Sequence, residues 1–194
     1  MAAEPVDHRR AVAERNVEAI LDAAEALLEE AAPTSIAAVA TRAKVSRPTV
    51  YAHYASRELL LEAVVERAVA RAATAFDEAT VDAPSATDAL KRAVASSWVT
   101  LSRHAAIAEA AAAQLSSEAL RRTHEPGMSH VREMIDRGRA SGEFRTDVPA
   151  AWLVSVFHAL LHAAGDDVRA ERLQGDEALL ALTSTLLAAL APAR

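Results

Sequence analysis

Cysteine is absent from the 194-residue sequence, and glycine (five), proline (seven) and aromatic residues (4%) are scarce. Without cysteine, a disulfide framework, a cysteine-ligated zinc site and a thiol nucleophile are excluded. Strands favour β-branched and aromatic side chains, and many-stranded folds need frequent turns. The composition therefore excludes all-β and Rossmann-type folds.

Long apolar runs are also missing. The two stretches without Lys, Arg, Asp or Glu are 148–165 and 178–193, and both contain Ser, Thr, His or Pro. A membrane-spanning helix needs about 20 consecutive apolar residues. The first ten residues, MAAEPVDHRR, lack the apolar core of a signal peptide. We therefore expect a soluble, cytoplasmic protein without membrane contact.

Alanine is abundant, with 49 residues of 194. Because alanine is the strongest helix former, the fold class predicted is all-α. Apolar periodicity and capping residues predict helices near 9–30, 36–43, 47–54, 56–80, 85–104, 105–115, 117–140, 149–164 and 176–190, the seventh interrupted at Pro126-Gly127. Ser35, Ser46 and Ser56 are the expected N-caps of the second, third and fourth.

The segment from Thr34 to Glu62 carries the functional signal. Its two short helices, joined by a three-residue turn, predict a helix-turn-helix. Small apolar residues form the seam between them, and the third helix presents slim or hydrogen-bonding side chains that suit a DNA major groove. The outward residues are Arg47, Thr49, Tyr51, Ala52 and His53.

Charge is distributed unevenly along the chain. Residues 36–57 hold four basic and no acidic side chains, whereas the whole protein has a net charge of −6. A basic patch on an acidic protein is typical of a DNA-binding protein. Arg9, Arg10 and Arg15 could extend the contact as an arm. A solvated face of an ordinary helical bundle explains the same charges, so this pattern alone leaves both interpretations open.

The run from Ser35 to Leu61, S-I-A-A-V-A-x-x-A-x-V-S-R-P-T-V-Y-x-H-Y-x-S-R-E-x-L-L, closely resembles the DNA-binding signature of the tetracycline-repressor (TetR) family. With the helix before it, the resemblance covers about residues 9–65. Beyond this segment it is limited to helix count and the G-E-F-R-T-D turn at 142–147.

The resemblance implies a homodimer whose third helices enter successive major grooves of a palindromic DNA operator. Bases would face Arg47, Pro48 and Thr49, and Arg47 can pair bidentately with guanine. Phosphates would be held by Ser35, Tyr51, His53 and Arg57. The full set of expected DNA-binding residues is Ser35, Lys44, Ser46, Arg47, Pro48, Thr49, Tyr51, His53 and Arg57.

Lys44 departs from the family pattern, which usually has glycine in this turn. The position favours a positive φ, which glycine adopts without strain. A lysine there should cost about 1 kcal/mol while adding a charge beside phosphate. We expect Lys44 to trade stability for non-specific DNA affinity.

The resemblance also implies three segments: a DNA-binding domain over 9–55, a connecting helix over 56–80, and a ligand-binding and dimerisation domain over 81–194. The last two predicted helices, 149–164 and 176–190, have apolar residues around much of their circumference, so they must be covered on more than one face. The predicted dimer interface comprises Leu153, Phe157, Leu160, Leu161, Leu179, Leu182, Leu186 and Leu190. The predicted ligand pocket comprises Trp98, Leu101, His104, Ile107, Met128, Met134 and Phe157, with His124 as a further polar candidate. Each pocket residue could equally be ordinary core.

Other chemistry has little support. His158 and His162 share a helix face, as metal ligands sometimes do, but no carboxylate or cysteine accompanies them at ligand spacing, so we predict no metal and no cofactor. Enzyme motifs such as G-x-S-x-G or a P-loop are absent from the sequence. We predict a DNA-binding transcriptional regulator, most simply a repressor released by a small-molecule effector. The alternative is a helical protein-interaction or non-specific DNA-binding module without an effector.

Overall fold

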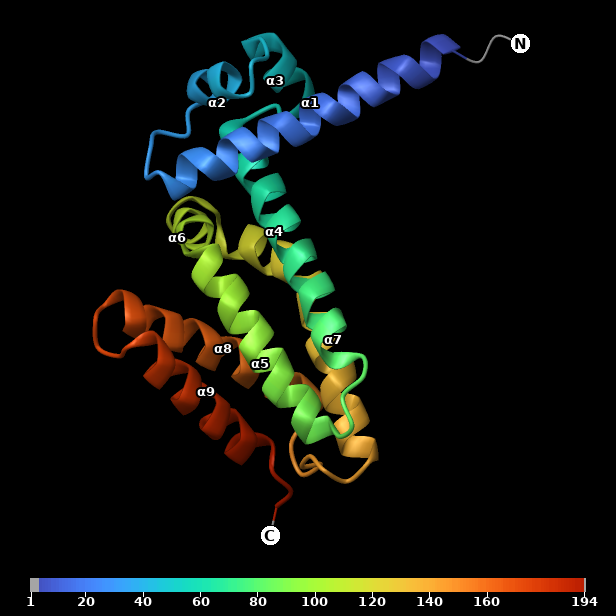
Figure 1. The fold of residues 1–194 in the computed structure, drawn as a ribbon, viewed down its shortest axis with the longest axis vertical. Coiled ribbons are helices and arrows are strands. Elements are labelled where there is room, and N and C mark those ends of the chain that lie inside the picture. Colours follow the sequence, from blue (N-terminus) through green and yellow to red (C-terminus); the bar gives the residue numbers. More distant parts are fainter. Residues whose placement is uncertain (1–3, 194) are drawn as a thin grey trace. The chain divides into compact units, whose positions relative to one another are not determined.

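The computed structural model describes residues 4–193, with side chains for all of these except 4–9, 103, 112, 121 and 126. Over this range the chain forms nine helices and no strand (Figure 1). In chain order they are α1 (Glu4–Glu29), α2 (Ile36–Arg42), α3 (Arg47–His53), α4 (Arg57–Thr80), α5 (Ala86–Arg103), α6 (Ala105–Gln114), α7 (Ser117–Ala140), α8 (Ala150–Arg169) and α9 (Gly175–Leu190). The predicted all-α fold class is confirmed.

The chain divides into two compact units, each discontinuous in sequence. Unit 1 is the chain up to Arg67 together with Ala106–Thr123, and unit 2 is Ala68–Ala105 together with the chain from His124 onward. The predicted domains, in contrast, are contiguous segments. Both α4 and α7 belong partly to each unit.

Local chemistry sets where the helices begin and end. The hydroxyls of Ser35, Ser46 and Ser56 accept hydrogen bonds from backbone amides three residues later, at 3.1–3.2 Å, so the predicted caps are confirmed. Three helices end at non-glycine residues with left-handed backbone: Ala31 (φ 51°) after α1, Lys44 (φ 56°) after α2 and Glu171 (φ 56°) after α8. There the next amide bonds back to a carbonyl five residues earlier, the Schellman arrangement.

The helices differ from the prediction in three places: one start, one end and one expected interruption. α1 begins at Glu4, not Arg9, and α8 continues to Arg169, not Ala164. α7 runs without a break through residues 126 and 127. At Gly127 this helix comes so close to α4 that a Cβ would lie 3.2 Å from Val69 Cγ1, so tertiary packing overrides the local tendency of Pro-Gly to end a helix.

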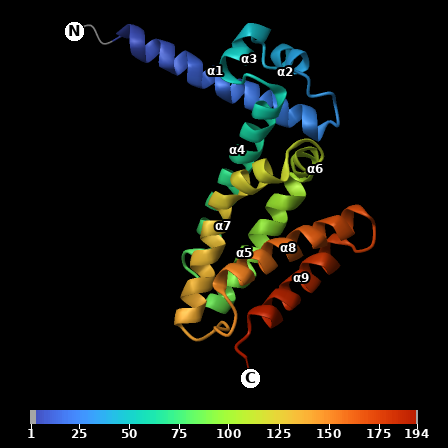
Figure 2. The same cartoon turned by 180° about the vertical axis from the view of Figure 1, so that it is seen from behind.

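Unit 1 is built around α1, with α2 and α3 packed on it (Figures 1 and 2). One apolar stripe of α1 faces inward: Ile20, Leu21, Ala24 and Leu27 are buried. The second segment of the unit adds its own inward row, with Ile107, Ala111, Leu115 and Ala119 at intervals of four residues. This row gives α6 and the first turn of α7 a place in the core of unit 1.

Unit 2 has one hydrophobic core, centred on α5, α8 and α9. The last two helices lie side by side in both views, and both pack on α5 (Figures 1 and 2). Phe144, in the turn after α7, packs directly on Gly138, where a Cβ would lie only 2.1 Å from the ring. In the same turn, the carboxylate of Glu143 accepts hydrogen bonds of 3.0 Å from the amides of Ala86 and Thr87 and so caps α5.

No helix in the described part of the chain is long and apolar enough to cross a membrane.

Candidate nucleic-acid interface

The helix-turn-helix of unit 1 is formed by α2 and α3. Ile36, Val39, Ala40 and Val50 are buried between these helices and α1 and make the predicted seam. Ser46 supports the start of α3 twice, since its hydroxyl accepts from the Thr49 amide at 3.2 Å and lies 2.7 Å from the Thr49 hydroxyl. The two short helices are therefore fixed against each other by packing and by capping.

The outer face of this pair carries most of the expected DNA-binding side chains. Lys44, Ser46, Arg47 and Pro48 are exposed, and Tyr51 is 54% exposed. Ser35 is exposed at the start of α2, whereas Thr49 and His53 are half-buried. The fold thus presents hydrogen-bonding groups from α3, from the turn before it and from the start of α2 on one helix pair, as a major-groove reader requires.

Lys44 has the backbone that the resemblance predicted. Its φ is 56°, and the amide of Val45 donates to the Ala40 carbonyl at 3.0 Å. For a residue with a Cβ this conformation is strained by about 1 kcal/mol or slightly more. The side chain is exposed, so its charge stands free at the turn between the two helices.

The basic patch carries less free charge than the sequence suggests. The guanidinium of Arg42 donates two hydrogen bonds, at 2.6 and 2.7 Å, to the carboxylate of Glu30 at the end of α1. Arg57 is also engaged within the protein, as described below. Residues 36–57 contain four basic side chains. Among the described residues, only Lys44 and Arg47 of these four make no hydrogen bond or ion pair.

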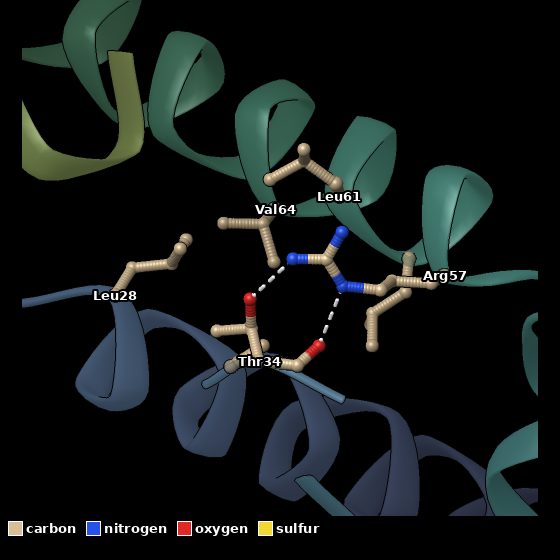
Figure 3. A pocket seen from close by; sticks show the side chains of 7 residues that line it. Leu28, Thr34, Arg57, Leu61 and Val64 are labelled. Carbon is tan, nitrogen blue, oxygen red and sulfur yellow. Dashed lines mark hydrogen bonds between the residues drawn. The ribbon is translucent and has the colours of Figure 1, made fainter. Parts of the chain in front are cut away.

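Arg57, at the start of α4, bonds to protein groups on two sides. Its Nε donates to the Thr34 carbonyl at 2.9 Å and its Nη2 to the Thr34 hydroxyl at 2.8 Å (Figure 3). Its Nη1 donates to the side chain of Gln114, the last residue of α6. Beneath these bonds lies a small hollow lined by apolar residues of α1 and α4, among them Leu28, Leu61 and Val64 (Figure 3). No pattern in the sequence predicts these contacts, because they join residues 23 and 57 positions apart.

A second arginine fastens α4 to α1. Arg67 donates to Glu25 at 3.0 Å, to Asp22 at 2.8 Å and to Glu18 at 3.1 Å, and only 11% of its side chain is exposed. Burial raises the pKa of the nearby Tyr54 hydroxyl. Three carboxylates around one guanidinium make this a firm join between the first and fourth helices.

The residues expected to line a ligand pocket fall in both units. Trp98, Met134 and Phe157 are buried in the core of unit 2, where Leu101 and Met128 pack at its margin. His104 also belongs to unit 2, and Ile107 lies in the core of unit 1. The expected pocket therefore stays a prediction, and the members that share a unit are those of unit 2.

Histidines gather on α7 and α8 in unit 2. The ring centroids of His124 and His162 are 6.2 Å apart, and the ring of His158 packs edge-on against Phe157. Burial, helped by its histidine neighbours, lowers the pKa of His158 to about 4. The described side chains include no group of three or more His, Asp or Glu residues that could hold a metal ion.

The structure puts most of the expected interface leucines inside unit 2. Leu153, Phe157, Leu161, Leu182, Leu186 and Leu190 are at most 7% exposed, and only Leu160 and Leu179 are half-buried. The six already pack within their own chain, so they cannot supply the surface that meets a partner. The apolar residues that remain outside are on the opposite faces, with Trp152 61% and Leu180 71% exposed.

Comparisons with known proteins agree with this geometry. Residues 20–64 match the bacterial regulatory proteins of the tetR family. No curated protein matches the sequence. The fold resembles a TetR family transcription regulator from Marinobacter aquaeolei VT8, with 18% identity, a TM-score of 0.70, and 94% of this chain and 98% of that chain covered.

Two further similar structures contain ligands. LfrR from Mycobacterium smegmatis, in complex with proflavine, has 22% identity and a TM-score of 0.66 over 91% of this chain and 97% of that chain. RolR, in complex with resorcinol, has 18% identity and a TM-score of 0.73 over 94% and 91%. At these identities the likeness concerns the fold, and the family match at 20–64 adds support for DNA-binding regulation. The resemblance drawn from the helix-turn-helix motif is thus confirmed by the match of residues 20–64 to the tetR family of bacterial regulatory proteins.

Proposed function

We propose that this protein is a sequence-specific transcriptional repressor that binds a palindromic operator as a homodimer and is released by a small-molecule effector. The observation that carries the proposal is the exposed face of α3 within the segment that matches the tetR family. Arg47 stands in the first turn of that helix, where a guanidinium can reach the edge of a guanine.

Within this proposal, Arg47, Pro48 and Thr49 read bases, while Ser35, Lys44, Ser46, Tyr51 and His53 hold the DNA backbone. Base contacts provide discrimination, whereas phosphate contacts fix register without reading sequence. The exposure of Lys44, Arg47 and Tyr51 supports these roles. Arg57 is not part of the phosphate-binding set, because its guanidinium is bonded to Thr34 and Gln114.

The dimer forms through the outer faces of α8 and α9. Trp152 and Leu180 are the most exposed large apolar side chains on these helices, and small residues such as Ala159, Ser184 and Ala188 are exposed on the same helices. No charged residue occurs between 150 and 165 or between 178 and 190. A wide, uncharged, small-residue face suits close packing with an identical face under two-fold symmetry.

The effector binds in unit 2, near Leu101 and Met128 at the margin of the core that contains Trp98 and Phe157. The ligands named for LfrR and RolR, proflavine and resorcinol, are aromatic, and an apolar wall with a few imidazoles suits molecules of that kind. The Nδ1 of His104 and the Nε2 of His158 are buried without a hydrogen-bond partner in the described structure, so each could bond to a ligand.

Release follows from a population shift. Two recognition helices can read one operator only when they are about 34–36 Å apart, one turn of DNA. An effector that binds more tightly to a dimer with a different spacing lowers the fraction of protein able to bind operator. α4 runs from the helix-turn-helix in unit 1 into unit 2 as one continuous helix, so it is the proposed connection.

The experiment that tests this proposal is selection of bound duplexes from randomised DNA, followed by sequencing. An enriched palindrome with two equal half-sites supports a dimeric sequence reader. Salt-sensitive binding to every duplex without enrichment would instead indicate a non-specific DNA-binding module. Arg47→Ala is the matched variant, because it should relax sequence preference at one position of each half-site.

A further inference from the structure

Three of the five N–H groups of Arg57 are already bonded within the protein. A guanidinium binds an oxyanion best through two parallel N–H groups along one edge. The Nε–Nη2 edge of Arg57 is occupied by the carbonyl and hydroxyl of Thr34 (Figure 3). At the remaining edge, Nη1 donates to Gln114. A bidentate phosphate contact would therefore require breaking bonds that the fold has already made.

The three residues of this link, Thr34, Arg57 and Gln114, come from three parts of unit 1. Thr34 directly precedes Ser35, whose hydroxyl caps α2 and so begins the helix-turn-helix. Arg57 is the first residue of α4, and Gln114 is the last residue of α6. One side chain thus fixes the entry to α2 relative to both α4 and the end of α6.

A second contact acts in the same place. Arg122, in the second turn of α7, lies 3.5 Å from the carboxylate of Glu62, which is five residues after Arg57 on α4. Together the two contacts hold the segment from Gln114 to Arg122, which we name the α6–α7 corner, against the first two turns of α4. The chain leads from this corner into unit 2 on both sides, along α6 to residues 105–106 and directly at residues 123–124.

We propose that Arg57 is a positioning residue that ties the helix-turn-helix to the α6–α7 corner and makes no contact with phosphate. The inference deepens the proposed function, on which it rests, by naming a coupling residue for it. A shift of the corner breaks the Arg57–Gln114 bond, and α2 then loses one of the restraints that set its position. DNA binding in unit 1 thereby becomes sensitive to events in unit 2.

Gln114→Ala is the central test, because it removes the corner's side of the link without changing charge. We expect it to weaken binding to the selected palindrome by roughly tenfold, the effect of losing about one charged hydrogen bond, while the slope of log affinity against log salt stays unchanged. Arg57→Lys keeps the charge but loses the fork, and it should weaken binding in the same way. Ser117→Ala, a neutral change at an exposed residue of the same corner, is the matched control and should bind as the wild type does.

A readout without DNA separates this inference from the proposed function. In the free protein, Gln114→Ala should speed hydrogen exchange at the amides of residues 36–53, and Ser117→Ala should leave it unchanged. If the wild type selects no palindrome, the repressor proposal fails, yet the exchange experiment still decides the role of Arg57.

The opposite results are equally specific. The inference is overturned if Gln114→Ala matches the wild type in both affinity and exchange. It is also overturned if Arg57→Lys keeps full affinity while Arg57→Gln lowers the salt slope by about 0.9 per subunit, because that pattern identifies a phosphate contact.

Discussion

Glu30 and Arg42 form a two-bond ion pair, at 2.6 and 2.7 Å, that joins the end of α1 to the end of α2. The hydrogen bonds from Arg42 lower the pKa of the Glu30 carboxyl, and Glu30 in turn raises the pKa of Arg42. One of the positive charges counted in the basic patch is thus already paired within the protein. The charge available to DNA is correspondingly smaller.

This pairing makes a prediction about salt dependence. Lys44→Ala should reduce the slope of log affinity against log salt by about 0.9 per subunit for each phosphate contact that is lost. Arg42→Ala removes the same formal charge but should leave the slope close to that of the wild type. Binding titrations over a range of salt concentrations measure these slopes. An equal loss of slope for Lys44→Ala and Arg42→Ala would contradict the assignment.

Lys44→Gly should raise the melting temperature while weakening DNA binding. Glycine relieves strain of about 1 kcal/mol at the φ of 56°, which corresponds to roughly 2–4 °C for a chain of this size. Ala31→Gly is the matched control, because Ala31 has the same backbone (φ 51°) after α1 and is not among the expected DNA contacts. It should raise the melting temperature similarly and leave DNA affinity unchanged. A lower melting temperature for Lys44→Gly would exclude the strain argument.

Local signals in the sequence predicted local structure well. The caps at Ser35, Ser46 and Ser56 depend on residues three positions apart, so their pattern is visible in the sequence. The positive φ of Lys44 was implied by the resemblance, since the family usually has glycine in this turn. The partners of Arg57 are not visible in the sequence, because they lie 23 and 57 residues away.

Burial was harder to predict. The leucine stripes of α8 and α9 were expected to face a second copy, but the core of their own unit covers six of the eight residues. A helix that is apolar all round must be covered twice, and periodicity does not say which stripe meets which partner. The uninterrupted α7 has a similar explanation, because close packing of Gly127 on Val69 outweighs the local effect of Pro-Gly.

Gly138→Ala should destabilise the protein markedly. A Cβ at this position would lie 2.1 Å from the ring of Phe144, which is only 3% exposed and has little room to move. Overpacking of this kind costs about 1–3 kcal/mol. Urea unfolding measures the loss. Gly175→Ala is the control: it starts α9 with open space around it, so the variant should be neutral or slightly more stable.

The stability of the folded protein should depend on pH through two side chains, His158 and Glu143, each in its own pH range. His158 has a folded pKa of about 4 against an ordinary value of 6.5, because burial and the neighbouring His162 and His124 favour the neutral ring. The unfolded chain therefore takes up the proton first, and stability should fall as the pH drops from 6.5 towards 4. In His158→Leu this fall should be smaller. Melting temperatures at pH 7 and pH 5 test it, and an unchanged difference would contradict it.

Glu143 acts at lower pH. Hydrogen bonds from the amides of Ala86 and Thr87 lower its pKa from 4.5 to about 2 in the folded protein. The stabilisation that the Glu143 carboxylate gives to the folded protein is present above pH 4.5 and is lost as the pH falls towards 2. Glu143→Gln should therefore melt at a lower temperature than the wild type at pH 7, and the two should converge near pH 2.5. A constant difference at all pH values would show that the carboxylate charge is not responsible.

Trp152→Glu should convert the dimer to a monomer. The indole is 61% exposed within one chain and lies on the face proposed to pair, where a buried, unpaired carboxylate would be costly. Light scattering should give a mass of 20.5 kDa for the variant and twice that for the wild type. Val81→Glu, which puts the same charge on an exposed residue between α4 and α5, should stay dimeric. A wild-type mass of 20.5 kDa would remove the basis of the proposed interface.

Because unit 1 recruits Ala106–Thr123 from the middle of the chain, the DNA-reading part cannot be exchanged as a simple N-terminal cassette. Consider a hybrid regulator in which residues up to 67 come from another protein. It would keep the α6–α7 corner of this chain, so Gln114 and Arg122 would face an α4 that lacks their partners Arg57 and Glu62. Such a hybrid could still fold and bind its operator, yet respond poorly to its effector. Successful hybrids should be those in which the head and residues 106–123 are transplanted together.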